Sequence, residues 1–234
     1  TPSPWRTLLN PNAVGTATQD QFGQTLALEG NNLLVGTTME DSPHETAGIV
    51  YYYDISTWGS GNPTPTYTVA NPNADGTTNT SDYFSVSLVI SGSKWAAAAT
   101  YEDENGTSSG SVYIFNVSGG ALVHRIDGPS TYPRYLFGRS LALDGNNLIS
   151  SSSDSNTGQE KWLHRYDISA LSGSTTTATT SDSGTITNPG AADNQWPGRI
   201  TFKDDMLVTG AQYDDNTNAS GGTHSNSGVV YVFE

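Results

Sequence analysis

The sequence predicts an all-β protein: a four-bladed β-propeller whose blades are four-stranded antiparallel sheets. Three observations support this fold class. One segment recurs four times, each copy contains a short turn between apolar runs, and the two ends of the chain carry incomplete copies that complement each other. Repeats with a period of tens of residues are typical of propellers and solenoids, in which no single repeat can bury its apolar face alone.

The first copy of the repeat begins at Phe22 and reads FGQTLALEGNNLLVG. The second begins 62 residues later at Phe84, the third 115 residues later at Phe137, and the fourth 174 residues later, where Trp196 replaces phenylalanine. The approximate blade boundaries are 14–74, 75–129, 130–191, and 192–234 together with 1–13. Because the repeats need one another, we expect residues 1–234 to form a single domain.

Each copy carries three strand signals in the same order. Residues 25–28 form the first strand signal, with the apolar residues Leu26 and Leu28 at alternate positions. A two-residue turn (Gly30-Asn31) leads to a second apolar run at residues 32–36. Such a turn between apolar runs is a strong hairpin signal. A polar loop then leads to residues 49–54, whose aromatic and β-branched side chains suit a half-buried strand.

A fourth strand is expected after each third strand. Residues 66–74 (TYTVANPNA) follow the first copy and match residues 5–13 (WRTLLNPNA), which have no copy in front of them. The fourth copy ends at Glu234 without such a segment. We therefore expect residues 5–9 to pair with residues 229–233 and close the ring, because closure removes exposed sheet edges. The long polar connections 56–65 and 169–183 are expected to be solvated outer loops or partner contacts.

Composition excludes several classes of protein. The net charge is −14 with only nine Lys and Arg, which disfavours nucleic acid as a partner. Cysteine is absent, so disulfides and thiolate chemistry are excluded. No stretch approaches the ~20 apolar residues of a membrane helix, so no membrane insertion is expected. Residue 1 is Thr and no signal peptide is present, as expected of a mature or excised form.

The pattern FGRSLALDGNNL at 137–148, an acidic loop such as YEDENG at 101–106, and GVVYVF at 228–233 together resemble the FG-GAP type of repeat. That resemblance covers nearly the whole chain. It implies a propeller similar to those of integrin α-subunits and of bacterial surface and marine phage structural proteins, and hence a location outside the cell or on a virion. The D-x-D-x-D-G calcium loop of integrin-type repeats is missing from the hairpins here, so those sites do not carry over.

Acidic clusters follow the second strand of three copies. The candidate calcium ligands are Glu102, Asp103 and Asn105 in the second copy and Asp214 and Asp215 in the fourth, and Glu40-Asp41 occupies the same place in the first. Calcium takes six to eight oxygens, including carboxylates. The alternative is that these are solvated loop tips rich in turn-forming residues. The only cofactor that the sequence suggests is therefore calcium.

Aromatic residues outside the repeat are candidates for ligand contact. Trp58, Tyr132 and Tyr135 lie in connections beside polar residues, a setting that suits sugar or protein contacts. The aromatic residues that recur at matching strand positions, such as Tyr51 and Tyr113, are expected to pack between blades.

Catalytic signals are weak. No G-x-S-x-G elbow occurs, and His44, His124, His164 and His224 show no metal-ligand spacing. The sequence therefore favours a non-catalytic, surface-exposed binding or structural module, of the adhesion or virion appendage and decoration type. Its partner would be a protein or glycan ligand, or other subunits of a larger assembly. The alternative is a polysaccharide hydrolase or lyase with facing carboxylates in the propeller channel.

Overall fold

The hairpin that opens each repeat forms as the sequence predicts. In a computed structural model of the chain, Gly30, Gly92 and Gly145 have φ of 56°, 58° and 56°. This is the left-handed region that type I′ turns require. The structure describes residues 3–12, 20–41, 46–74, 81–129, 135–154, 159–177, 185–187, 189, 198–211, 216–217, 223–224 and 228–234.

The strands form four main sheets, which we call sheets A to D, and a short two-stranded ribbon. Sheet A contains β1 (Thr25–Glu29), β2 (Asn32–Thr37), β3 (Ile49–Asp54) and β4 (Tyr67–Ala70). Sheet B contains β5 (Phe84–Ser91), β6 (Lys94–Ala99), β7 (Ser111–Asn116), β8 (Leu122–Asp127) and β12 (Thr175–Thr177). Sheet C contains β9 (Leu141–Asp144), β10 (Asn147–Asp154), β11 (Gln159–Asp167) and β13 (Ile186–Thr187). Sheet D contains β14 (Ile200–Lys203), β15 (Met206–Ala211) and β18 (Val229–Phe233), and the ribbon pairs β16 (Asn216–Thr217) with β17 (Thr223–His224).

The strand register repeats from sheet to sheet. Leu26 faces Val35 in sheet A, and the pairs one, two and three repeats later are Leu88 with Ala97, Leu141 with Ser150, and Ile200 with Thr209. The all-β prediction is confirmed, since the only helical element among the described residues is the 3₁₀ turn η1 (Ile55–Thr57). In that same part of the chain, no helix is long and apolar enough to cross a membrane.

Alternate side chains of each strand point to opposite faces, and successive sheets pack face to face. We call the face that packs on the following sheet the front face and the other the back face. In sheet A, Leu34 and Val50 lie on the front face and join the core with sheet B, whereas Val35 and Tyr51 lie on the back face. Similar cores join sheets B and C and sheets C and D.

The phenylalanine that opens a copy fixes the joint between sheets A and B and the joint between sheets B and C. Phe84 is fully buried, and its backbone N–H donates to the carbonyl of Ala47 in sheet A at 3.1 Å. Phe137 binds Ser109 of sheet B in the same way at 3.1 Å. The glycines that follow these acceptors, Gly48 and Gly110, lie directly against the Phe84 and Phe137 backbones, where an added Cβ would collide with a carbonyl oxygen. The Phe and the Gly thus repeat because the two backbones approach closely.

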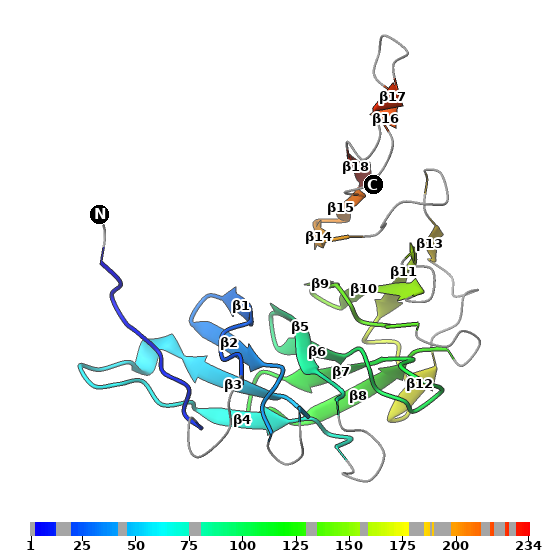
Figure 1. Cartoon of the computed structure of the whole chain (residues 1–234). Coiled ribbons are helices and arrows are strands. Elements are labelled where there is room, and N and C mark those ends of the chain that lie inside the picture. Colours follow the sequence, from blue (N-terminus) through cyan, green and yellow to red (C-terminus); the bar gives the residue numbers. More distant parts are fainter. Residues whose placement is uncertain are drawn as a thin grey trace.

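The predicted closed ring does not form in this structure. Figure 1 shows the sheets following one another along an open arc, with the N-terminal segment near one end and β18 near the other. Residues 5–9 form no strand, and in sheet D, as far as the chain is described, β18 pairs only with β15. The predicted pairing of residues 5–9 with residues 229–233 is therefore wrong for this conformation. The segment instead lies on sheet A, where Leu8 packs against the back face and Arg6 donates to Gly59.

The connection 169–183 also differs from its prediction as a solvated loop. Its residues Thr175–Thr177 form β12, which pairs in parallel with β8 at the outer edge of sheet B. His124 on β8 is buried and contacts this segment, with ring nitrogens 3.0 Å from the Gly173 carbonyl and 2.9 Å from the Thr176 hydroxyl. A run of β-branched threonines beside an open strand edge is suited to such pairing.

Candidate functional site

Trp58 lies at the outer edge of sheet A, directly after η1. Its ring stacks on that of Trp5, with centroids 6.0 Å apart, and meets Tyr53 edge to face at 6.1 Å. Trp5 is 66% exposed, and the Arg6 guanidinium lies 4.9 Å from the centre of the Trp5 ring. Beside Trp58, loop residues 57–59 and 61–64 line a hollow of about 170 Å³. We call Trp5, Arg6 and Trp58 the tryptophan surface.

The other two predicted ligand-binding aromatics have different outcomes. Tyr132 lies outside the described residues. Tyr135 is fully buried, so the prediction that it contacts a ligand at the surface is wrong. Its ring stacks on Trp162 and its hydroxyl lies 3.2 Å from His164 Nε2, because it belongs to the segment that joins sheets B and C.

Glu102, predicted as an exposed calcium ligand, is fully buried. The Tyr113 hydroxyl lies 2.6 Å and 2.7 Å from its two carboxylate oxygens. Burial raises the pKa of the Glu102 carboxyl, while the hydrogen bond from Tyr113 lowers it. Burial and the neighbouring carboxylate raise the pKa of Tyr113 as well. Because this carboxylate lies inside the core and faces Tyr113, the prediction that Glu102 is a calcium ligand of a surface loop is wrong.

The remaining predicted metal ligands do not converge. Asp103 accepts a hydrogen bond from the Ser108 backbone at 2.5 Å, and the Asn105 amide donates to the Gly128 carbonyl at 3.1 Å, so both hold their own loop. Among the described residues, no group of three or more acidic, histidine or cysteine side chains is arranged to hold a metal ion. Asp214 and Asp215 lie outside the described residues, and calcium binding there stays a prediction.

The carboxylate–phenol pair recurs one repeat earlier and was missed by sequence reasoning. Glu40 is buried and lies 3.4 Å from the Tyr51 hydroxyl, and its other oxygen accepts from Asn12 at 2.7 Å. Burial raises the pKa of Glu40. In both copies the tyrosine follows the glutamate by eleven residues, which is a signal that the sequence carries. Both glutamates turn inward instead of lying at loop tips: Glu102 meets Tyr113 in the joint between sheets A and B, and Glu40 lies between the back face of sheet A and the N-terminal segment.

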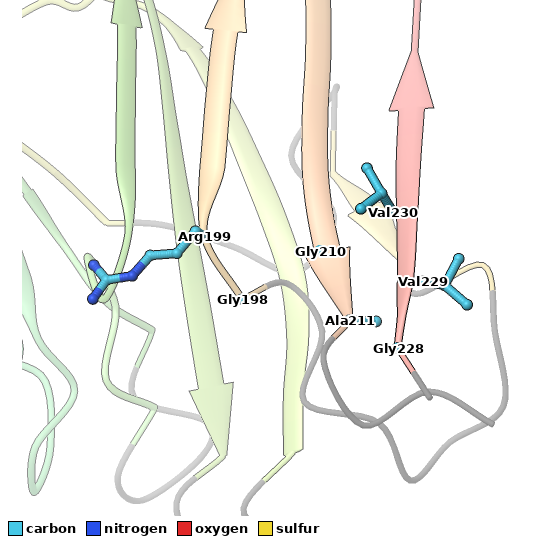
Figure 2. A pocket seen from close by; sticks show the side chains of 7 residues that line it. All are labelled: Gly198, Arg199, Gly210, Ala211, Gly228, Val229 and Val230. Atoms are coloured by element: carbon cyan, nitrogen blue, oxygen red, sulfur yellow. The ribbon is translucent and has the colours of Figure 1, made fainter. Parts of the chain in front are cut away.

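Sheet D has a cavity where sheets A and B have a neighbour. Gly198, Arg199, Gly210, Ala211, Gly228, Val229 and Val230 line about 500 Å³, and Figure 2 shows the β15 and β18 residues side by side, with the Arg199 side chain directed away from β18. Gly210 and Gly228 are the repeat equivalents of Gly36 and Gly48. An added Cβ at Gly36 would lie 2.8 Å from Ser85 Oγ of the next sheet, whereas at Gly210 the nearest atom would be 4.0 Å away. Aligning the repeats could have located this cavity.

A second groove runs along the innermost strands of all four sheets. Its volume is about 260 Å³, and its lining residues, from β1, β5, β9 and β14, are apolar apart from Thr201. β1 packs on β5, β5 on β9 and β9 on β14. No carboxylate is among these lining residues, although a glycosidase needs two that face each other across the sugar.

No protein-family model and no curated protein matches the sequence. Among solved structures, the chain is similar to the crystal structure of the computationally designed Ika4 protein, with a TM-score of 0.51 and 14% sequence identity. The match covers 100% of this chain and 98% of that chain. At this identity the similarity concerns the fold alone, and it extends over the whole arrangement of strands. The resemblance to FG-GAP repeats stays a prediction.

Proposed function

We propose that this chain is a non-catalytic binding or structural module, presented outside the cell or on a virion, in which sheets A to D act as propeller blades of the FG-GAP type. The observation that carries the binding role is the tryptophan surface. Trp5 and Trp58 offer stacked ring faces beside a polar hollow lined by Asn62 and Thr64. Aromatic faces next to hydrogen-bonding groups suit the apolar and hydroxyl faces of a sugar ring.

Two further features support a non-catalytic role. The buried carboxylates Glu40 and Glu102 are engaged by tyrosine hydroxyls inside the protein, so they serve packing. The side chains that line the innermost groove include no carboxylate or histidine that could act as a general acid or nucleophile on a polysaccharide. Such a module would contact a glycan or protein ligand, or neighbouring subunits, through its outer loops.

A glycan array with the full chain tests the proposal. We expect retention of a subset of glycans and no release of reducing sugar. Replacing Trp58 by Ala should weaken binding roughly tenfold or more, since aromatic anchors in such sites are worth about 2 kcal/mol. Tyr101→Ala is the matched control, because Tyr101 is also an exposed aromatic (46%) but lies in the acidic loop of the second copy.

Two outcomes would contradict this function. Turnover of a bound polysaccharide would favour the hydrolase or lyase alternative. Equal loss of binding in the Trp58 and Tyr101 variants would remove the tryptophan surface as the binding site. A calcium titration of the melting temperature separately tests whether the loop that contains Asp214 and Asp215 holds a cation.

A further inference from the structure

The back face of sheet A carries apolar side chains that the other sheets bury. Leu26 and Leu28 are each 62% exposed. The repeat equivalents of Leu26, Leu88 and Leu141, are only 8% and 5% exposed because they are packed into the joints between sheets. The equivalents of Leu28, Ile90 and Leu143, are partly buried. The back face of sheet A therefore has the apolar surface by which the other sheets pack on a preceding sheet, but no described sheet of the chain packs on it.

The front face of sheet D is the complementary half. Val230 and Val232 are 67% and 59% exposed. Their equivalents in sheet A, Val50 and Tyr52, are 0% and 6% exposed in the core shared with sheet B. Sheet D therefore presents the face that every other sheet packs against its successor.

The N-terminal segment marks where a preceding sheet lies relative to sheet A. The Asn71 amide, just after β4, donates to Asp82 at 2.8 Å, and this contact ties sheet A to the start of the next copy. One repeat earlier, Asn10 donates to Asp20 at the same distance of 2.8 Å. In both places the backbone N–H of the residue two positions after the asparagine donates to the asparagine side-chain oxygen at 3.0 Å.

Two further contacts of the segment match those of β4. Val69 packs into the core between sheets A and B, and Leu8 packs on the back face of sheet A. The Tyr67 hydroxyl donates to Val117 in the turn after β7 at 2.8 Å, and Arg6 donates to Gly59 in the corresponding turn after β3 at 2.6 Å. Residues 6–12 thus occupy the place of a fourth strand and its turn from a sheet in front of sheet A. In the part of the chain that the structure describes, sheet D has three strands where sheets A and C have four.

The cavity in sheet D matches the Phe22-Gly23 segment. In sheets A and B, the equivalent positions Gly48 and Gly110 are covered by the backbones of Phe84 and Phe137. The next phenylalanine in this series is Phe22, at the start of sheet A. A neighbouring sheet A with its N-terminal segment would cover the front face of sheet D, supply its fourth strand and fill its cavity.

We infer that sheet D packs on sheet A of a second copy of this chain, and that residues 5–9 of that copy pair with β18. Within one chain the two end faces lie apart (Figure 1), so closure there would require the three existing joints to change. A second copy leaves them unchanged. The interface is head to tail, and such interfaces form rings when the rotation closes. Two copies are the smallest assembly that covers every end face. This assembly goes beyond the proposed function and does not depend on any glycan or protein ligand.

Equilibrium sedimentation and native mass spectrometry of the full chain test the assembly. We expect twice the 24.7 kDa mass of one chain. Val230→Asp and Leu26→Asp should each give monomers. The dimer contains two identical joints between sheet D and sheet A, and either substitution places a charge in both of them. An equimolar mixture of the two variants should regain dimers, since it restores one unaltered joint. Monomeric wild type, species of three or more chains, or a mixture that stays monomeric would overturn the inference.

Engineered cysteines decide between the two closures without relying on mass, because the chain has no cysteine of its own. In sheet A, Val50 on β3 is paired with Val69 on β4. Their repeat equivalents are Val230 on β18 and Leu8 in the N-terminal segment. The variant carrying Val230→Cys and Leu8→Cys should form a disulfide between chains under mild oxidation. The matched control, Val50→Cys with Val69→Cys, should form one within the chain. A disulfide within the chain in the test variant, or none while the control oxidises, contradicts pairing between copies.

Discussion

Sheets B and D have equivalent sequences but different surroundings. Sheet B packs between sheets A and C, and Trp95, Phe115 and Val112 are at most 1% exposed. Among the described residues, sheet D packs on sheet C alone, and its front face leaves Val230 and Val232 largely exposed. The same strand pattern thus produces a core sheet or an end sheet according to its neighbours. Two predictions test this difference, and a third tests the carboxyl buried beside sheet B; each is to be measured at dilutions where the chain is monomeric.

The largest effect is expected from truncating equivalent aromatics. Phe115→Ala should lower the free energy of unfolding by about 3–5 kcal/mol, because it empties a space in the core between sheets A and B. The Phe233 side chain is only half-buried, against sheet C. Phe233→Ala should therefore lower the free energy of unfolding by less than half of that amount. Urea denaturation of both variants provides the measurement. Equal losses would mean that sheet D is as enclosed as sheet B.

A smaller effect is expected from the glycines at the joints. Gly110 and Gly228 have φ of 79° and 76°, so alanine should cost about 1–2 kcal/mol at either position from backbone strain alone. At Gly110 an added Cβ would also lie 2.5 Å from the Phe137 carbonyl oxygen, which should add about 1–3 kcal/mol. Thermal and urea unfolding of Gly110→Ala and Gly228→Ala give this difference. If the two variants match, the Phe137 backbone does not restrict Gly110.

The smallest effect is a pH dependence from Glu102. Because burial raises its pKa above 4.5 in the folded state, its contribution to stability is present at low pH and is lost as pH rises through the folded pKa. Glutamine does not titrate. The free energy of unfolding of Glu102→Gln should therefore rise relative to that of the wild type as the pH rises from about 4 to 8, by at most about 1.4 kcal/mol per pH unit. Urea unfolding across this range gives the slope.

Glu40→Gln is the control for the Glu102 variant. Glu40 makes a longer contact with its tyrosine, 3.4 Å against 2.6 Å, and its other carboxylate oxygen accepts from Asn12 of the N-terminal segment. Its slope with pH should therefore have the same sign and a smaller size. A flat profile for Glu102→Gln relative to wild type would show that the buried carboxyl titrates normally.

The candidate sites show where sequence reasoning stops. Trp58 is a candidate because it lies outside the repeat and beside polar residues, which is a local property, and its contact with a ligand stays a prediction. Glu102 was misassigned because the acidic loop YEDENG looks solvated in sequence, while its first glutamate turns inward to Tyr113 on β7. Tyr135 was misassigned for the same reason: its environment is His164 and Trp162, which are 27 to 29 residues away.

By itself, the sequence determined the strands of each sheet, their register and the hairpin turns, because these depend on side-chain alternation and on glycines or aspartates within a few residues. It also determined that residues 5–13 repeat the segment after the first copy. Only the tertiary structure decided where that segment lies, that β12 joins sheet B, and that the arc of sheets stays open. Those outcomes depend on contacts between residues far apart in the chain, such as Arg6 with Gly59 and β8 with β12. A local sequence pattern does not show which distant segments come close in space.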